Sequence, residues 1–594
     1  MKERIAVVDR ELCNPNVSGY ACLKACPVNR SGDECIYISK EDGKIFIDEN
    51  LCIGCGICVK KCPKNAITVV NLPKELKEEP VHRYGRNMFS LYRLPVPKHH
   101  AVVGLVGANG MGKSTVLNIL SGNLKPNAGL FDKEIVWEEI IKRFRGSELQ
   151  GYLEKLASQG ITCAYKPQQV DAIPKVWKGK VKELLESICS DSERIEEIAT
   201  ELGIKGIMEN EVANLSGGEL QLLAIGATIL KDAEFYFFDE PSSYLDVTER
   251  LKAAKLIRKL SKKAKVMVVE HDLAIADYLA DYVHILYGKS GVFGIVSKPY
   301  AVRNGINIYL EGYIPEENIR FREEPIVFSK RAKTSEKVKF FASFPWFEKR
   351  FSSFCLTTEP GNLYKGEIIG ILGPNGTGKT TFIKMIAGEV KPDKGEALTD
   401  IKLSYKPQRL LLSEEEEEMM VREYIIEKSG GLPKSTEEKR LLRFLGIERL
   451  LDRRMRNLSG GELQSVFILC SLIKEHEMLL MDEPSAFLDV EQRLRVAKLL
   501  RNHAESREIP MFVVDHDLQF IDAISDRIIV FEGERGIRGY AHAPCFLEDG
   551  MNAFLKAMDV TFRRDPVTGR PRANKPGSQK DVEQKQKGKY YYAE

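Results

Sequence analysis

The chain contains the stretch Gly107-Ala-Asn-Gly-Met-Gly-Lys-Ser114 and, later, the stretch Gly373-Pro-Asn-Gly-Thr-Gly-Lys-Thr380. Both match the phosphate-binding loop pattern G-x-x-x-x-G-K-[S/T], in which backbone N–H groups surround the phosphates of a nucleotide. An apolar, strand-like run precedes each loop (101–106; 367–372), and a helical pattern follows it. The strand–loop–helix order predicts an α/β nucleotide-binding domain around each loop.

Four further motifs recur in the same order after each loop, so the chain contains an internal repeat. They are Tyr-Lys-Pro-Gln (165–168; 405–408), Leu-Ser-Gly-Gly-Glu (215–219; 458–462), an apolar run ending in Asp-Glu-Pro (239–241; 482–484), and Val-Val-Glu-His-Asp (268–272) or Val-Val-Asp-His-Asp (513–517). The loop lysine and the glutamine are 168 − 113 = 55 residues apart in the first copy but 408 − 379 = 29 in the second. The extra residues fall at about 131–157, where two amphipathic patterns (134–144; 148–156) predict a helix–loop–helix insertion.

These residue types suit hydrolysis of ATP with Mg²⁺. The loop lysines are expected to reach the β- and γ-phosphates, and the Glu after each strand-ending Asp to polarise the attacking water. The predicted loop residues for ATP are Gly107, Asn109, Gly110, Gly112, Lys113, Ser114, Thr115, Gly373, Asn375, Gly376, Gly378, Lys379, Thr380 and Thr381. The predicted Mg²⁺ ligands are Ser114, Gln168, Asp239, Thr380, Gln408 and Asp482. The predicted catalytic residues are Glu240, Glu483, His271, His516, Gln168 and Gln408.

Leu-Ser-Gly-Gly-Glu places a serine and two glycines at a helix N-terminus, which forms a second anion site. With this motif the two segments, roughly 80–293 and 340–532, resemble ATP-binding cassette (ABC) proteins. The resemblance implies a head-to-tail sandwich with two composite ATP sites. The first site would add Ser459 and Gly461 to the first loop, the second would add Ser216 and Gly218 to the second loop, and Asp246 and Asp489 would communicate across the interface. Tyr84 and Phe89 are candidates to stack on adenine in the first cassette, although packing explains either residue as well; the second cassette offers no clear counterpart.

Eight of the 13 cysteines lie between residues 13 and 62, which is typical of metal ligation rather than disulfides in a reducing compartment. Cys52-x2-Cys55-x2-Cys58-x3-Cys62-Pro resembles the run of two-cluster bacterial ferredoxins, and Cys22-x3-Cys26-Pro repeats its end. The resemblance assigns Cys52, Cys55, Cys58 and Cys26 to one [4Fe–4S] cluster. It assigns Cys13, Cys22 and Cys62 to the other, with Cys35 taken as the eighth ligand. Zinc is the alternative, but this cysteine spacing suits zinc poorly.

The composition fits a globular protein of several domains, with 43% hydrophobic and 29% charged residues and a net charge of +3. The absence of a long apolar run and of a signal-like N-terminus predicts a cytoplasmic protein. We expect an α/β fold with two P-loop domains of the ABC type, an N-terminal ferredoxin-like α+β domain and a hinge. The expected limits are 1–75 (ferredoxin-like), 80–293 and 340–532 (cassettes), 294–339 and 533–570 (hinge), with a basic tail from 563 that is either solvated or an RNA-binding arm.

The combination of a ferredoxin-like domain, two complete cassettes and a helix–loop–helix insertion resembles the ABCE family, also called RNase L inhibitor. The segment 563–575 and the terminal Tyr-Tyr-Tyr are similar to that family's ending, so the resemblance spans the whole chain. It implies a monomer, with an internal pseudo-dimer, that splits ribosomes by ATP-driven closure. The implied partners are the small ribosomal subunit with its rRNA and a release factor or Pelota; hinge candidates for rRNA contact are Arg303 and the Lys and Arg residues of 320–333. Alternatives are an ATP-coupled electron donor, a transporter ATPase and a DNA-repair ATPase.

Overall fold

The computed structural model describes residues 4–40, 42–73, 78–328, 339–395, 401–431 and 435–591. The chain divides into two compact units. The first comprises Met1–Pro241, Lys255–His271 and Leu279–Pro325, and the second comprises Ser242–Ala254, Asp272–Tyr278 and Ile326–Glu594. Among the described residues, no helix combines the length and the apolar composition that crossing a bilayer requires.

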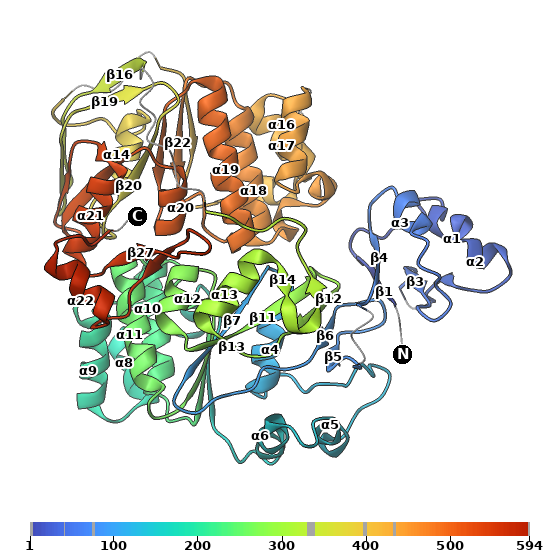
Figure 1. The fold of residues 1–594 in the computed structure, drawn as a ribbon. Coiled ribbons are helices and arrows are strands. Elements are labelled where there is room, and N and C mark those ends of the chain that lie inside the picture. The colour runs from blue at the N-terminus through green and yellow to red at the C-terminus, as the bar shows by residue number, and fades with distance from the viewer. Residues whose placement is uncertain are drawn as a thin grey trace. The chain divides into compact units, whose positions relative to one another are not determined.

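The first unit begins with a small α+β domain whose core is made largely of cysteine and isoleucine side chains. Two antiparallel strand pairs, β1 with β4 and β2 with β3, flank three short helices (Figure 1). The elements are β1 (Arg4–Val8), α1 (Ala21–Ala25), α2 (Pro27–Arg30), β2 (Ile36–Ile38), β3 (Ile45–Ile47), α3 (Ile57–Lys61) and β4 (Ile67–Asn71).

Buried polar contacts attach this domain to the next one within the first unit. The Arg83 guanidinium donates to both carboxylate oxygens of Glu49, at 2.8 and 2.5 Å. Asn87, in the left-handed backbone region, donates to the carbonyls of Ala6 and Ile47 and accepts the N–H of Ile47. The residues that hold the two domains together therefore lie in the same short turn as Tyr84 and Phe89.

The first cassette is built on a nine-stranded sheet with a parallel centre. The strand order is β5, β6, β12, β11, β7, β10, β9, β8, with β13 paired to β11. Strand β9, which lies next to the edge strand β8, is buried along its whole length, and its apolar sequence Phe-Tyr-Phe-Phe suits a strand covered on both faces. The strands are β5 (His82–Arg83), β6 (Ser90–Tyr92), β7 (Val102–Gly107), β8 (Cys163–Lys166), β9 (Phe235–Asp239), β10 (Lys265–Val269), β11 (Tyr282–Lys289), β12 (Phe293–Val296) and β13 (Tyr300–Ala301).

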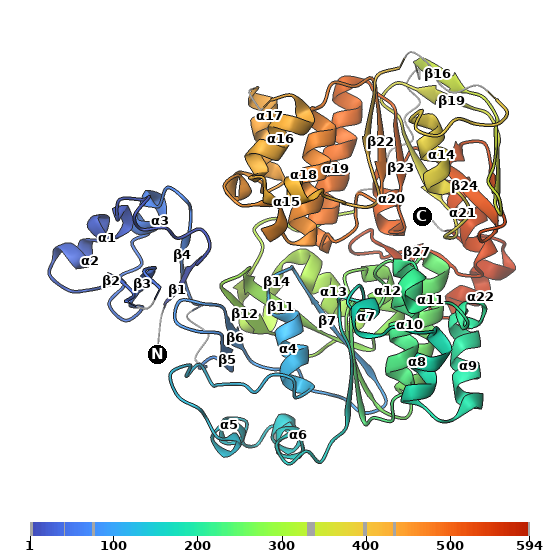
Figure 2. The same cartoon turned by 180° about the vertical axis from the view of Figure 1, so that it is seen from behind.

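Helices of the first cassette follow the motifs in the order expected from the sequence. The insertion forms α5 and α6, which lie side by side at one edge of the domain in both views (Figures 1 and 2). The helices are α4 (Lys113–Leu120), α5 (Trp137–Arg143), α6 (Glu148–Ala157), α7 (Ile173–Val176), α8 (Val181–Ile188), α9 (Ser192–Leu202), α10 (Gly217–Leu230), α11 (Val247–Leu260) and α12 (Leu273–Leu279).

The second cassette repeats this topology. Its sheet has the order β17, β18, β25, β24, β20, β23, β22, β21, with β26 paired to β24 and a separate β16–β19 pair. The strands are β16 (Phe340–Phe344), β17 (Phe347–Arg350), β18 (Cys355–Thr358), β19 (Gly361–Tyr364), β20 (Ile368–Leu372), β21 (Leu403–Lys406), β22 (Met478–Asp482), β23 (Met511–Val514), β24 (Arg527–Glu534), β25 (Arg538–Ala541) and β26 (Cys545–Phe546). The helices are α14 (Lys379–Ile386), α15 (Glu414–Glu418), α16 (Val421–Ser429), α17 (Thr436–Phe444), α18 (Gly460–Ile473), α19 (Val490–Arg507), α20 (Leu518–Ile524) and α21 (Leu547–Ala557).

The C-terminal segment is folded, which differs from the interpretation of the basic tail as a solvated stretch, whereas RNA binding stays a prediction. Arg570 is completely buried, and its guanidinium donates to Asp277 at 3.0 Å. Arg572 pairs with the same carboxylate and with Asp565. These arginines neutralise buried carboxylates and are not available to RNA. The linking elements are α13 (Val302–Glu311), β14 (Tyr313–Ile314) and β15 (Ile319–Arg320), and the terminal ones are β27 (Phe562–Arg564), β28 (Pro571–Ala573) and α22 (Gln579–Gln586).

Two buried histidines, His284 and His503, are expected to lower the free energy of unfolding in weak acid. Burial lowers the pKa of His284 to about 4, and burial together with Arg507 and His476 lowers the pKa of His503 to about 3. Each pKa is lower when folded than when unfolded (about 6.5), so the unfolded chain binds more protons between those values. Between pH 7 and pH 5, each histidine should reduce the free energy of unfolding by about 2 kcal/mol. Thermal melts between pH 7 and pH 5 should show a weaker pH dependence for His503→Gln than for wild type. Equal pH dependence of the two proteins would contradict the assignment.

Candidate active sites

Each phosphate-binding loop curls around the ammonium group of its lysine. In the first, Lys113 Nζ donates to the carbonyls of Gly107 (2.8 Å) and Ala108 (2.9 Å). In the second, Lys379 Nζ donates to Gly373 and Pro374, both at 2.8 Å. The last loop glycine in each copy has a left-handed backbone and starts the following helix. The other predicted loop residues lie in the same loops or first helical turns: Asn109, Gly110, Gly112, Ser114, Thr115, Asn375, Gly376, Gly378, Thr380 and Thr381.

Three side chains from different strands meet at the carboxyl edge of the first sheet. Glu240 follows β9 with φ of 47°, a left-handed conformation that costs a non-glycine residue about 1–2 kcal/mol. Its Oε1 accepts a hydrogen bond from Gln168 Nε2 (2.8 Å) and lies 3.3 Å from His271 Nε2. The structure thus brings together the Gln, Glu and His that the motifs predicted.

The second site has the same arrangement. Glu483 has φ of 49°, accepts from Gln408 Nε2 at 2.7 Å and lies 3.2 Å from His516 Nε2. Burial opposes ionisation of Glu483, but the hydrogen bond and charge of His516, with the charge of Lys379, outweigh it and lower the pKa of Glu483 to about 2. The carboxylate is therefore ionised at neutral pH, as a group that polarises water must be.

The aspartates before these glutamates fit a Mg²⁺ ion. Asp239 and Asp482 are buried, and one carboxylate oxygen of each has no hydrogen-bond partner within the described residues. Thr380 Oγ1 donates to the other oxygen of Asp482 at 2.9 Å. Burial and the charge of Glu483 raise the pKa of Asp482 to about 6. A buried carboxylate oxygen without a donor is costly, and Mg²⁺ binds hard oxygen ligands of this kind, so Asp482 and Thr380 suit the ion.

The signature serines begin the long helices α10 and α18. Ser216 caps α10, and its N–H and hydroxyl both donate to the Glu219 carboxylate (2.8 and 2.7 Å). Ser459 makes the equivalent contacts with Glu462 at the start of α18. The predicted Gly218 and Gly461 lie in the first turn of these helices. Each serine is thus held at a helix N-terminus, where N–H groups favour an anion.

Ser242–Ala254 follows the first Asp-Glu-Pro motif in the sequence but belongs to the second compact unit. Two of its residues contact the second phosphate-binding loop. Asp246 Oδ2 accepts the N–H of Asn375 at 2.8 Å. Asn375 Nδ2 donates to Glu249 Oε2 at 3.2 Å, and Glu249 also pairs with Arg535 at 2.6 Å. At Asn375, the second loop is therefore in contact with two acidic residues of the first sequence repeat. Asp489, the predicted counterpart, caps α19 by accepting the N–H of Gln492.

Aromatic side chains lie beside both loops, including two that the motifs did not identify. Tyr84 is half exposed, with its hydroxyl 3.1 Å from Thr115 Oγ1, and Phe89 packs on Gly112. In the second cassette Phe354 packs on Gly378, and the half-exposed Phe351 stacks on Phe354. The sequence spacing could have identified Phe354, because it precedes Gly378 by 378 − 354 = 24 residues and Phe89 precedes Gly112 by 112 − 89 = 23 residues.

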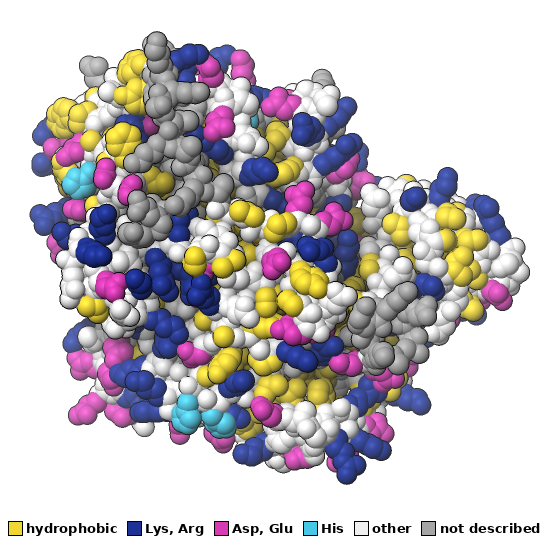
Figure 3. Space-filling view, in the orientation of Figure 1, with side chains coloured by type: hydrophobic (Ala, Val, Ile, Leu, Met, Phe, Trp, Pro, Cys, Tyr) yellow, Lys and Arg dark blue, Asp and Glu magenta, His cyan; other side chains and the backbone are white. Residues whose placement is uncertain are grey.

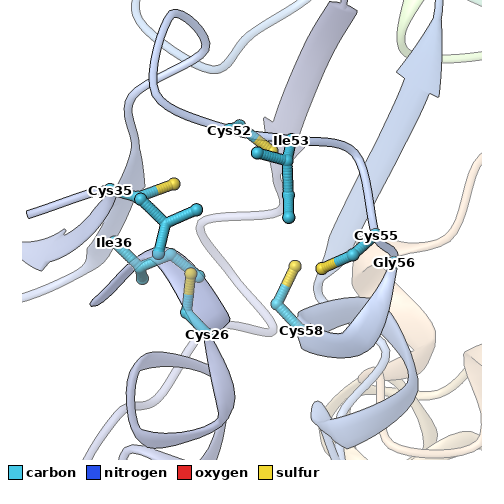
Figure 4. A pocket seen from close by; sticks show the side chains of 9 residues that line it. Cys26, Cys35, Ile36, Cys52, Ile53, Cys55, Gly56 and Cys58 are labelled. Carbon is cyan, nitrogen blue, oxygen red and sulfur yellow. The ribbon is translucent and has the colours of Figure 1, made fainter. Parts of the chain in front are cut away.

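The cysteines form two groups. Five of them, Cys26, Cys35, Cys52, Cys55 and Cys58, line one cavity (Figure 4). Burial, followed by the neighbouring Cys52, raises the pKa of Cys58 to about 11. The second group is Cys13, Cys22 and Cys62, which lie in or against the core of the domain. Burial and then the neighbouring Cys62 and Cys13 raise the pKa of Cys22. Converging thiols of this kind fit an iron–sulfur cluster, whose irons stabilise the thiolate form.

The structure places Cys35 with the first group rather than with the second group to which it was assigned. Pairing of β2 with β3 fixes Cys35 opposite Asp48, whose N–H donates to the Cys35 carbonyl at 2.7 Å. The N–H of Cys52 donates to the Asp48 carbonyl at 2.9 Å. Strand pairing therefore places Cys35 beside Cys52, and the spacing of the cysteines in the sequence does not reveal this proximity.

Comparisons with known proteins agree with both kinds of site. The family model described as ABC transporter matches residues 97–243 and 360–486, and the model described as 4Fe-4S binding domain matches residues 45–68. The cassettes therefore bind ATP and Mg²⁺ as an ABC-type ATPase, and the N-terminal domain holds [4Fe–4S] clusters rather than zinc.

Similarity to characterised proteins extends over the whole chain. ABC transporter E family member 1 of Arabidopsis thaliana is 44% identical over 99% of this chain and 98% of its own length. A structure titled as a model of ribosome-bound archaeal Pelota and ABCE1 matches with a TM-score of 0.93 at 49% identity, covering 100% of this chain and 99% of that one. A complex of the archaeal stalk protein aP1 with the archaeal ribosome recycling factor aABCE1 matches with a TM-score of 0.80 at 50% identity, covering 87% and 99%. The chain therefore belongs to the ABCE family of twin-cassette ATPases with two [4Fe–4S] clusters.

Proposed function

We propose that this ATPase recycles ribosomes, using closure of its two cassettes on ATP to separate the ribosomal subunits after termination or rescue. The observation that carries the proposal is the full-length similarity to ABCE1 in its ribosome-bound form with Pelota. The partners would be the small subunit with its rRNA, a release factor or Pelota, and the stalk protein named in the second match. The site of action would be the cytoplasm, where ribosomes work.

In the proposed cycle, each ATP is gripped by the loop of one cassette and the signature serine of the other. Reversing a 1:99 preference for the open state requires about 5.5 kcal/mol of differential binding. A few charge-assisted hydrogen bonds to the γ-phosphate, at about 1.5–3 kcal/mol each, are sufficient. Glu240 and Glu483 would polarise the attacking water, with His271 and His516 beside the γ-phosphate. Loss of the γ-phosphate would remove the group that both cassettes bind, and the two cassettes would separate again.

Surface chemistry suggests where the partners would bind. On the face shown in Figure 3, Lys and Arg side chains gather in one group left of the centre and are elsewhere interspersed with acidic ones, and hydrophobic side chains gather on the N-terminal domain. Exposed hydrophobic residues of that domain include Val17 (68%) and Ile53 (56%), and we propose that it contacts the release factor or Pelota. Arg303 on α13 is exposed and is a candidate for rRNA contact, with the insertion helices α5 and α6. The sequence also predicted rRNA contacts for the Lys and Arg residues of 320–333, of which Lys330, Arg331 and Lys333 lie outside the described residues.

The proposal predicts nucleotide-dependent binding to small ribosomal subunits. With an ATP analogue that cannot be hydrolysed at the γ-position, the protein should co-sediment with small subunits, because the analogue keeps the cassettes closed. With ADP, co-sedimentation should be weak. A variant with Lys113→Ala and Lys379→Ala, which cannot hold the phosphates, is the matched control and should stay in the supernatant with either nucleotide. Absence of binding with the analogue would overturn the recycling function.

A further inference from the structure

A buried lysine donates hydrogen bonds to the backbone of each predicted catalytic glutamate. Lys166 ends β8, is completely buried and donates from Nζ to two successive carbonyls, those of Asp239 (2.9 Å) and Glu240 (3.3 Å). Gln221 of α10, also completely buried, donates to the Glu240 carbonyl at 2.7 Å. Three hydrogen bonds thus converge on the backbone of the acid pair.

The second cassette repeats the arrangement atom for atom. Lys406 ends β21, is completely buried and donates to the carbonyls of Asp482 (2.8 Å) and Glu483 (3.2 Å). Gln464 of α18 donates to the Glu483 carbonyl at 2.8 Å. Burying a lysine is costly, so its presence at the same point of both repeats calls for a compensating role.

The role follows from the backbone conformation. Glu240 and Glu483 are left-handed, which turns their carbonyls away from the regular strand hydrogen bonds. The next residue is Pro241 or Pro484, which has no N–H to help fix the turn. The lysine and glutamine supply the donors that hold these carbonyls in place. Two residues after each lysine, Gln168 or Gln408 binds the glutamate's carboxylate, so one Lys-Pro-Gln segment holds both the backbone and the side chain.

We propose that Lys166 and Lys406 are positioning residues for ATP hydrolysis: each holds the left-handed turn that aims its glutamate at the attacking water. Gln221 and Gln464 support the same turn from the helices that begin at the signature serines. The lysines contact neither nucleotide nor water in this role and act through the glutamate alone.

The test is the full-length variant carrying Lys166→Met and Lys406→Met. Methionine keeps most of the unbranched side chain but cannot donate a hydrogen bond. We expect kcat for ATP to fall by about 10- to 100-fold, since a displacement of about 1 Å in a catalytic group can cost about 100-fold. KM for ATP should stay within about twofold of wild type because the phosphate-binding loops are unchanged. Lys402→Met, an exposed lysine before β21 that pairs with Glu475, is the control and should retain wild-type kcat.

Epistasis separates positioning from a general structural role. Adding the two lysine changes to a Glu240→Gln and Glu483→Gln background should lower the single-turnover rate by less than about twofold, because the group they position is already disabled. The proposal would be overturned if the lysine changes lowered the rate by the same factor in the Glu→Gln background as in wild type. It would also be overturned if the lysine variant alone kept the wild-type kcat, whether or not its KM for ATP rose. If the methionine variant does not fold, Gln221→Met with Gln464→Met removes the companion donors and should lower kcat with KM unchanged; wild-type kcat in that variant would also contradict it.

Discussion

Replacing Glu240 and Glu483 by Gln is expected to lower ATP turnover by at least about 100-fold while leaving ATP bound. General-base assistance contributes about 10²- to 10⁴-fold, and an amide of the same shape cannot provide it. ATP binding should persist because Lys113, Lys379 and the Mg²⁺ ligands are intact. Radiolabelled ATP that stays on the protein during gel filtration measures the retained, unhydrolysed nucleotide.

The matched control for this change is Glu475→Gln. Glu475 is a largely exposed residue shortly before β22, and its side chain pairs with the exposed Lys402. Turnover in this variant should equal wild type. Unchanged turnover in both Glu240→Gln and Glu483→Gln would remove these glutamates from the catalytic assignment.

Replacing Cys58 by Ser is expected to remove half of the bound iron and sulfide. Cys58 faces the cavity with Cys26, Cys52 and Cys55, and an alcohol is a far poorer iron ligand than a thiolate (Figure 4). Chemical analysis of iron and sulfide in the purified protein measures the loss. Cys355→Ser, in β18 of the second cassette, is the control and should keep all of the iron. Full iron content in Cys58→Ser would contradict the assignment of this cavity to a cluster.

Cys35 is tested by the same assay. The resemblance to the ferredoxin run assigns Cys26, Cys52, Cys55 and Cys58 to the cluster in this cavity, so Cys35→Ser is expected to retain that cluster. Loss of half of the iron with the Cys52 cluster intact would instead assign Cys35 to the group of Cys13, Cys22 and Cys62.

The catalytic constellation could be predicted because its parts follow strands. Gln168, Glu240 and His271 come directly after or shortly after β8, β9 and β10, and parallel strands bring their carboxyl ends to one edge. The motif order therefore fixed which side chains meet, without any knowledge of long-range contacts. The same reasoning applied to both copies, and both copies show the same geometry.

Other features depend on contacts that no local pattern encodes. The basic composition of 563–594 predicted a solvated or RNA-binding tail, but Arg570 and Arg572 are buried against Asp277, nearly 300 residues earlier in the chain. Cys35 is placed by strand pairing rather than by its spacing from other cysteines. Lys166 and Lys406 belong to the Tyr-Lys-Pro-Gln motifs. Their proposed role, however, depends on long-range hydrogen bonds from these lysines to the backbone carbonyls of Glu240 and Glu483.

We propose that each ATP site takes residues from both cassettes. The most direct measurement is photolabelling with 8-azido-ATP under trapping conditions, followed by mapping of the labelled peptides to one cassette or the other. Ser216→Arg should abolish trapped label in the second cassette, where Lys379 lies, and Ser459→Arg should abolish it in the first, where Lys113 lies. If each change instead removed label from its own cassette and spared the other, the two cassettes would work as separate ATPases, which would contradict ATP sites shared between them.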